Sequence, residues 1–473
     1  MTPSAEVRKR LGHPVIDVDG HLFEFEPAFL DYLRQVGGPA LVDRCRAWTD
    51  GSLFRWYRLS PEERRAQRVT RPPWWGMPTR DTRDFATAML PKLLHERLPE
   101  FGVDFMVIYP TMGLFHNKVA GDDLPAVIRA LNTFYADLFR GLSDRIAPAA
   151  IIPMQEPRQA IAELEHAVQV LGLKAIVLAS VTPRPVPAAG RPDVQWLDNY
   201  ALDSAHDYDP FWARCVELKV APTAHLAGLW GARTSPSSYV YNHIGMFASA
   251  GEALCKALFL GGVTRRFPAL RFAFLEGGVA WACTLYSDLV EHWKKRNRQA
   301  VQQYDPAKLD AARLKDLCAR YGGSLTDGRL DRVLDLPLLR QGWTQEPDML
   351  DEWSRCGIER PEDVRDLFVP SFYFGCEGED PMNAWAFSSR VNPMGSRLKA
   401  VFGSDLGHWD VPHPEEVLSE AYELVEKGLL SEEDFRDFVF VNPASLHAGM
   451  NPAFFKGTAV ESAVDQLLAS GRI

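Results

Sequence analysis

Five side chains that can bind a divalent metal ion stand at the ends of predicted β-strands. They are Asp19, His21, His225, Glu276 and Asp405. Asp19 and His21 are two residues apart on one strand, so they project from the same side, and Gly20 lets the backbone turn tightly between them. Imidazole nitrogens and carboxylate oxygens together suit Zn, Fe or Mn. We therefore predict a site for one or two divalent ions, with all five side chains as ligands.

Each of these signals is weak when it is taken alone. An Asp-x-His sequence at the end of a strand is more often a turn or a helix cap than a metal site. His225 also fits a buried core histidine, and Asp405 fits the N-cap of a following helix. The signals gain weight because they recur at the ends of strands that are far apart in the sequence.

Polar residues beside these five extend the candidate site. His243 lies in the loop sequence Asn242-His-Ile-Gly245, where a ligand or substrate contact and a structural role are about equally expected. His408 and Asp410 flank Trp409 just after Asp405, so these three are candidates to orient ligands or contact substrate. A glutamate near a divalent ion is ionised and can ligate the ion or act as a base. The candidate catalytic residues are Glu276, Asp405 and His243.

The elements that must position these residues alternate regularly between strand and helix. Apolar β-branched runs predict eight strands, and amphipathic segments between them predict helices. This βα succession belongs to the α/β class and favours a (β/α)8 TIM barrel, whose active sites lie at the carboxyl ends of the strands. The predicted strands are 15–22, 104–109, 147–153, 175–178, 220–225, 271–275, 371–374 and 398–403, and the helices include 124–140, 157–171, 211–218, 254–266, 279–299, 415–427 and 432–440.

The chain is longer than one barrel of about 250 residues requires. We predict a single barrel domain over residues 14–455 with two insertions, followed by a tail at 456–473. The insertion at 23–99, after the first strand, is predicted to form a lid over the barrel mouth, and the charged segment 300–366 is predicted to be helical and to precede the seventh strand. The lid residues Trp74, Trp75, Arg80 and Arg83 suggest an apolar or aromatic substrate that carries an anionic group such as a carboxylate.

The overall charge and the cysteines exclude several classes of protein. A net charge of −10 and a pI near 5.7 provide no general attraction for nucleic acid or anionic membranes. No signal-peptide pattern and no membrane-spanning run of about 18 apolar residues occur, so a cytoplasmic location is expected. The seven cysteines are an odd number without C-x-x-C spacing, which argues against a disulfide framework and a thiolate zinc site. The expected partner is a small-molecule substrate.

Two motifs carry a resemblance to a known family. Ile16-Asp-Val-Asp-Gly-His21 and Phe402-Gly-Ser-Asp-Leu-Gly-His-Trp-Asp410 resemble the amidohydrolase-related (amidohydrolase 2, aminocarboxymuconate semialdehyde decarboxylase-like) branch of the metal-dependent amidohydrolase superfamily. The resemblance covers about residues 14–300 and 368–455. It implies that the protein is a homo-oligomer. It also implies that Asp19 is a metal ligand, at a position where many relatives have His or Glu. Its other implied ligands are His21, His225 and Asp405.

One position departs from the pattern of the decarboxylases in this branch. These relatives carry a His-Gly-Gly motif after the sixth strand, and its histidine serves in acid/base chemistry. This chain has Phe274-Leu-Glu-Gly-Gly278 instead, so Glu276 stands in place of the histidine. A carboxylate at this position changes both the charge of the site and its proton chemistry.

Three functions are compatible with these residues. The first is hydrolysis or non-oxidative decarboxylation of a small organic substrate, in which a water bound to the ion is activated. The second is oxygen-dependent hydroxylation by a dinuclear iron or manganese/iron monooxygenase, because six candidate ligands including His243 suit a bridged pair of ions. The third is a barrel without catalysis that serves as the partner subunit of a paralogue, against which the intact ligand set argues.

Overall fold

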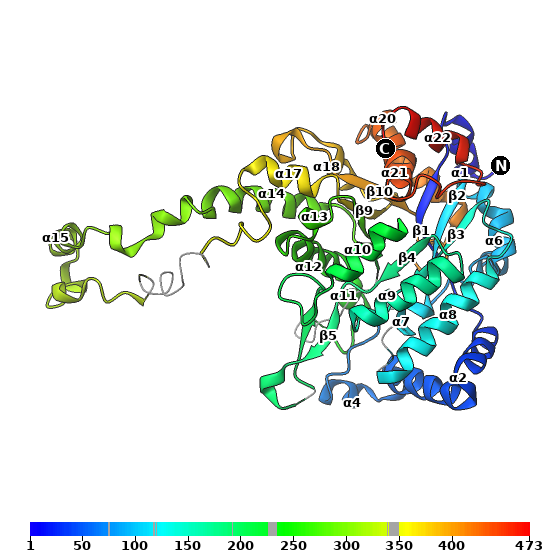
Figure 1. Cartoon of the computed structure of the whole chain (residues 1–473), viewed down its shortest axis with the longest axis horizontal. Coiled ribbons are helices and arrows are strands. Elements are labelled where there is room, and N and C mark those ends of the chain that lie inside the picture. The colour runs from blue at the N-terminus through cyan, green and yellow to red at the C-terminus, as the bar shows by residue number, and fades with distance from the viewer. Residues whose placement is uncertain are drawn as a thin grey trace.

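Eight parallel strands form the centre of the molecule in the computed structural model, which describes residues 1–73, 76–116, 119, 121–191, 193–225, 234–337, 339 and 350–473. The strands follow one another around the sheet in chain order (Figure 1). They are β1 (Ile16–Leu22), β2 (Phe105–Pro110), β3 (Ile146–Ile151), β4 (Ala175–Leu178), β7 (Pro222–Ala224), β8 (Phe272–Phe274), β9 (Phe372–Glu377) and β10 (Lys399–Gly403).

The first and last strands meet and nearly close the sheet. The Asp405 backbone N–H donates a hydrogen bond to the carbonyl oxygen of Asp19 at 2.9 Å, and the Ser404 hydroxyl donates to Asp17 at 2.5 Å. Helices surround the strands, and the predicted (β/α)8 barrel is confirmed. The main surrounding helices are α8 (Leu124–Leu138), α9 (Pro157–Glu165), α10 (Asp209–Leu218), α12 (Met246–Leu260), α14 (Ala280–Arg296), α19 (Val417–Glu426) and α21 (Asn442–Ala448).

The strands are almost fully buried because both of their faces are covered. Every residue of β1, β2 and β4 is buried, as expected for strands whose side chains point either into the barrel or against the helices. In α8, the buried residues Val127, Ile128 and Leu131 recur at helical spacing and turn one face of the helix toward the strands.

Gly20 has a different role from the predicted tight turn. It lies inside β1, where the pairing with β2 is irregular between Asp17 and Gly20. A Cβ atom at position 20 would stand 2.4 Å from the sulfur of Met106 on β2. The residue is therefore small because a neighbouring side chain occupies the space, and the prediction about its turn is wrong.

The predicted lid is spread over more than one surface. Helix α2 (Glu26–Trp48) packs against α8 on the outside of the barrel (Figure 1). The middle of the segment does reach the mouth, because the Trp56 indole donates to the Pro236 carbonyl at 2.7 Å and the Arg71 backbone N–H donates to the Ser235 carbonyl at 3.0 Å. These contacts lie beside α11 (Tyr239–His243). A lid role for residues 23–99 stays a prediction.

One of the four lid residues named above, Arg83, points away from the barrel mouth. The Arg83 guanidinium is paired with Glu100 at 2.7 Å, and Glu100 precedes β2, at the opposite end of that strand from its carboxyl end. Arg80 is exposed to solvent. Trp74 and Trp75 lie outside the described residues.

Two further features were not expected from the sequence. Strands β5 (Thr182–Pro185) and β6 (Gln195–Asp198) form an antiparallel hairpin after β4. Residues 302–337, which follow α14, project from the barrel as a long arm with α15 (Ala311–Tyr321) at its far end (Figure 1). The chain then returns through α17 (Pro361–Phe368), which packs against α14. Among the described helices, none combines the length and apolar character needed to cross a bilayer.

Candidate metal centre

Asp19, His21 and His225 come together at the carboxyl ends of β1 and β7. The Nε2 atoms of His21 and His225 are 3.1 Å apart. Asp19 Oδ1 lies 3.4 Å from Nε2 of His21 and 3.6 Å from Nε2 of His225. All three side chains are buried. The arrangement is a compact three-donor group below the barrel mouth.

Asp405 and Glu276 approach the same group from β10 and β8. Asp405 Oδ1 is 3.4 Å from Nε2 of His21, and Glu276 Oε2 is 3.4 Å from Nε2 of His225. Both side chains are about 4% exposed. The structure therefore brings together all five residues that the sequence predicts as ligands.

The backbone at these two carboxylates adopts an unusual conformation. Glu276 has a φ angle of 55° and Asp405 has a φ angle of 49°, which places both in the left-handed region. Residues with a Cβ atom enter this region at a cost in free energy, and such strain is concentrated at functional sites. Each residue follows the last residue of its strand by two positions, so the left-handed turn aims its carboxylate back toward the barrel axis.

The donor set fits a divalent metal ion. Zinc holds its nitrogen and oxygen ligands at about 2.0–2.2 Å, so neighbouring ligand atoms stand roughly 3.0–3.5 Å apart. Five of the distances between these side chains, each involving His21 or His225, are 3.1–3.6 Å and are close to this spacing. Asp19 Oδ1 and Glu276 Oε2 are buried and accept no hydrogen bond from any described residue. Buried carboxylate oxygens normally have a partner, and a bound cation would provide one.

The protonation of these groups also favours a cation. Burial lowers the pKa of His21 to about 3 and the pKa of His225 to about 4, so both imidazoles are neutral and have a free lone pair. Burial raises the pKa of Asp19 to about 6, and it raises the pKa of Glu276 and of Asp405 well above the usual range, with neighbouring carboxylates adding to the shift. A divalent cation would relieve this crowding of negative charge.

His408 and Asp410 lie against the ligand group. The His408 Nδ1 atom is 2.7 Å from Asp405 Oδ1, and its Nε2 atom is 3.2 Å from the Thr111 hydroxyl. The His408 ring also stacks on His21, with 3.9 Å between ring centroids. These contacts hold the orientation of Asp405 and His21. Asp410 lies near Asp405, and its charge raises the pKa of Asp405.

His243 occupies the outer edge of the site, in α11. Its Nε2 atom lies 3.9 Å from Glu276 Oε1, and it forms a second candidate metal-binding group with Glu276 and Asp410. The rings of Tyr239, Trp409 and Phe247 surround it, with centroid distances of 5.2, 5.6 and 6.1 Å. Glu276 thus stands between the inner group and His243.

A model of a known protein family matches the sequence of this chain. The family model described as amidohydrolase matches residues 16–324, which is more than half of the chain. The chain belongs to the amidohydrolase family. The predicted class, a metal-dependent hydrolase or carboxy-lyase, is confirmed at this level. No curated protein sequence matches the chain significantly.

Solved structures of low sequence identity resemble this amidohydrolase. A dihydroxybenzoic acid decarboxylase from a Polaromonas species, solved with manganese and 2-nitroresorcinol, is 14% identical over 92% of this chain and 97% of that one, with a TM-score of 0.49. An amidohydrolase from Mycobacterium avium subsp. paratuberculosis is 17% identical over 92% and 99%, with a TM-score of 0.47. A 5-carboxyvanillate decarboxylase from Novosphingobium aromaticivorans is 14% identical over 92% and 96%, with a TM-score of 0.49.

Two buried acids near the site were missed by the sequence prediction. Asp17 accepts hydrogen bonds from the Ser404 hydroxyl and backbone N–H and from the Asp19 N–H, so it ties β1 to the loop after β10. Glu24 accepts hydrogen bonds from the backbone N–H groups of Met112 and Gly113 and fixes the loop after β2. Asp17 is two residues before Asp19, and this repeated spacing was the signal that could have identified it.

An acidic cavity of about 450 Å³ adjoins the metal centre of this amidohydrolase. Asp405 and Asp410 belong to its wall together with Glu377, Glu379 and Glu420. Burial and the neighbouring carboxylates raise the pKa of Glu377 to about 8. The space beside the site is therefore lined by many more acidic than basic groups.

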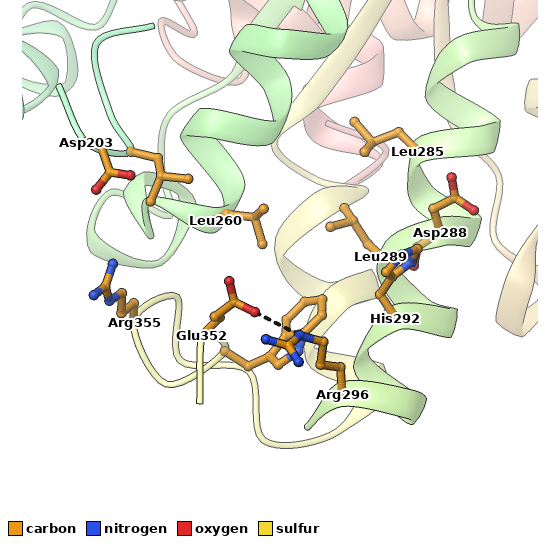
Figure 2. A pocket seen from close by; sticks show the side chains of 11 residues that line it. Asp203, Leu260, Leu285, Asp288, Leu289, His292, Arg296, Glu352 and Arg355 are labelled. Atoms are coloured by element: carbon orange, nitrogen blue, oxygen red, sulfur yellow. Dashed lines mark hydrogen bonds and ion pairs between the residues drawn. The ribbon is translucent and has the colours of Figure 1, made fainter. Parts of the chain in front are cut away.

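A second cavity, of about 320 Å³, lies away from the metal centre. Figure 2 shows it between the end of α12, the outer half of α14 and residues 352–355, with Leu260, Leu285 and Leu289 on its wall. An ion pair of 3.1 Å between Arg296 and Glu352 crosses one side. None of the predicted site residues lines this cavity, so we do not assign it to the reaction.

Proposed function

We propose that this amidohydrolase hydrolyses a small organic substrate that has an apolar or aromatic part and is neutral or positively charged where it meets the metal centre. The observation that carries the proposal is the charge of the site. Asp19, Glu276, Asp405 and Asp410 surround two neutral imidazoles, and within the described residues no Arg or Lys forms an ion pair with any of the four.

Asp19, His21, His225 and Asp405 would hold the ion. A bound divalent ion polarises a substrate carbonyl and lowers the pKa of water. The metal assignment follows from these four donors and from their spacing. The identity of the metal among Zn, Fe and Mn, and the number of ions, belong to the proposal.

Glu276 is the proposed general base. Its Oε2 atom faces His225, whereas Oε1 faces His243 at 3.9 Å and is closer to the mouth. Glu276 takes a proton from the attacking water as the oxygen bonds to the substrate carbonyl carbon. The carbon–nitrogen or carbon–oxygen bond then breaks, and the proton passes to the leaving nitrogen or oxygen, with His243 positioned to carry it. Asp405 assists by orienting the water, and the 2.7 Å contact between its Oδ1 atom and Nδ1 of His408 holds its position.

The apolar part of the proposed substrate follows from the rings beside His243. The rings of Tyr239, Trp409 and Phe247 lie around His243, which is 3.9 Å from the proposed base. An aromatic or other flat apolar group can stack there while the reacting bond reaches Glu276. The anionic group expected from the lid arginines is not part of the proposal, because Arg83 is paired with Glu100.

Decarboxylation, the other reaction of the confirmed class, is less well matched by the site. A substrate carboxylate would have to enter beside four protein carboxylates, and only the ion would attract it. The position at which the resembling decarboxylases carry a catalytic histidine is occupied by Glu276. A carboxylate at this position is suited to taking a proton from water.

One observation favours the oxygen-dependent alternative as a second candidate. His243, Glu276 and Asp410 form a donor group next to the inner one, and Glu276 is shared between the two. A shared carboxylate between two donor groups can bridge a pair of ions, as a dinuclear iron or manganese/iron monooxygenase requires. Two irons per chain and substrate-dependent oxygen consumption would establish this candidate in place of hydrolysis.

Turnover of two substrate panels tests the proposal. Aryl esters, anilides and lactones, with and without an amino group, are incubated with the metal-loaded enzyme in ¹⁸O-labelled water, and phenolic carboxylates are assayed for CO₂ release. We expect metal-dependent incorporation of ¹⁸O into the product acid, with amino-bearing compounds favoured. CO₂ release without hydrolysis of any ester, anilide or lactone contradicts the proposal.

A further inference from the structure

The arm that leaves the barrel after α14 is held at its base. Val301 is buried where the chain departs, and Leu350 is buried where it returns. The ion pair between Arg296 and Glu352 joins the two sides of the base (Figure 2). We define the arm as residues 302–337. The chain is therefore anchored to the barrel at the base of the arm.

The arm has no hydrophobic core of its own. None of residues 302–337 is buried, although the segment contains many large apolar side chains. Tyr321 is 76% exposed and Leu325 is 78% exposed. Isolated helices shorter than about 12–15 residues are marginal in water, and the 11 residues of α15 contact short turns at Gly323–Leu325 and Leu330–Arg332 of the same arm without burying any residue, so a further packing partner would stabilise the helix. The large exposed apolar residues of the arm are Tyr304, Leu309, Leu317, Tyr321, Leu325, Leu334 and Leu336.

The apolar residues of α15 form one ridge. Leu314, Leu317, Cys318 and Tyr321 follow the spacing i, i+3, i+4, i+7, which places them on one face of the helix. The opposite face carries small and charged residues. This is the pattern of a helix that packs against another helix along a single seam.

The charge of the arm indicates which kind of partner it meets. Residues 302–337 contain six acidic and six basic side chains, so the arm is neutral in a chain with a net charge of −10. A neutral surface of mixed sign has no attraction for nucleic acid or for a strongly charged protein. It is compatible with a second, identical surface, because acidic and basic groups can face each other in pairs across a twofold axis.

We propose that the arm binds the arm of a second copy of this chain, with the α15 ridges in contact about a twofold axis. An interface of standard size takes about 20–30 residues from each partner. The 36 residues of the arm supply this number without any contribution from the barrel. The axis passes near the middle of the ridge, so Leu317 and Cys318 lie close to their own counterparts in the other copy.

Sedimentation equilibrium of the full chain at micromolar concentration tests the arm contact. We expect a dimer in the wild type, and at least a tenfold weaker association in the double variant Leu317→Asp and Tyr321→Asp. The control is Ala312→Asp, which introduces one carboxylate, against two in the double variant, on the opposite face of α15 at an exposed position. All three positions are exposed, so thermal unfolding should show that each variant still folds. A monomeric wild type, or a dimer that survives the double variant, overturns the proposal.

Cys318 provides a direct measurement of ridge-to-ridge contact. It is intermediate in exposure, whereas the other six cysteines are buried. A short bismaleimide should therefore link two chains through Cys318 in the native wild type, and Cys318→Ser should abolish the link. A dimer that gives no crosslinked product through this cysteine contradicts the twofold contact of α15.

Discussion

Glu276 is the residue that most distinguishes this site from a histidine-based one. It holds a left-handed backbone conformation, one carboxylate oxygen faces His225, and the other faces His243. Its charge is surrounded by other carboxylates, so it is a strong base whenever it is ionised. We assign it the proton transfer, and we assign the binding of the ion to Asp19, His21, His225 and Asp405.

Replacement of Glu276 by Gln separates these roles. The amide keeps the size of the side chain and loses the ability to take a proton. General-base residues typically contribute about 10²–10⁴-fold to the rate, so we expect kcat to fall within this range while the metal content stays near that of the wild type. Glu379→Gln is the control, because Glu379 is exposed in the nearby acidic loop. Loss of the metal in Glu276→Gln would instead make Glu276 an essential ligand.

At the scale of elements, the seam between β1 and β10 positions the site. The loop after β10 is tied to β1 by Asp17 and by the hydrogen bond from Asp405 to Asp19. The strands approach so closely that a Cβ atom added at Gly403 would lie 2.7 Å from the Cβ atom of Asp19. Real Cβ contacts are not this short, so Asp19 can hold its place only beside a glycine.

Gly403→Ala should therefore damage the metal site without touching a ligand. The added methyl group forces Asp19 away from His21, and overpacking of this kind costs about 1–3 kcal/mol of stability. We expect a lower thermal midpoint in the metal-free protein and a weaker affinity for zinc in equilibrium dialysis. Gly12→Ala is the matched control, since nothing lies within 4 Å of a Cβ atom there. Equal behaviour of the two variants would show that the seam does not position Asp19.

The sequence allowed the eight strands of the barrel to be predicted, because each is a buried apolar run bounded by polar residues. The hairpin of β5 and β6 could not be predicted in this way. Thr182–Pro185 contains two prolines and Gln195–Asp198 is largely exposed, so neither segment has the alternation or the burial of a core strand. The projection of the arm could not be predicted either. The apolar residues of α15 have the same spacing as those of a helix that packs on its own domain.

The five ligand candidates were predictable because each lies in the last part of a strand or within two residues after it, and the carboxyl ends of the strands in a barrel converge. Supporting residues were harder to find. Glu24 lies beyond the end of β1 and acts on backbone N–H groups of residues 112 and 113, which are distant in the sequence. The space around Gly20 depends on the Met106 side chain of another strand, and no property of β1 alone indicates it.

At the scale of the whole molecule, a buried histidine that is not part of the metal centre, His447, should make the stability of the fold sensitive to acid. His447 in α21 is 1% exposed and stacks on Phe454 with 4.4 Å between ring centroids. Burial lowers its pKa from 6.5 to about 3. Below pH 6.5 the His447 imidazole binds a proton in the unfolded chain but stays neutral in the folded chain. The free energy of unfolding therefore decreases as the pH falls from 6.5 toward 3.

His447→Leu should remove this part of the acid sensitivity. Between pH 6 and 4, the free energy of unfolding of the wild type should fall relative to the variant by up to about 1.4 kcal/mol per pH unit. Urea unfolding of both metal-free proteins at several pH values measures the difference. The same substitution at the exposed His206 should leave the pH dependence as it is in the wild type. Parallel curves for the wild type and His447→Leu would contradict the account.

The central claim is that Asp19, His21 and His225 hold a divalent ion at the barrel mouth. Elemental analysis of the full chain, purified without chelator and compared with Asp19→Ala and His225→Ala, tests it most directly. We expect at least one Zn, Fe or Mn per chain in the wild type and less than a tenth of that in either variant. Full metal content in both variants, or a metal-free wild type that takes up no ion when it is supplied, would contradict the claim.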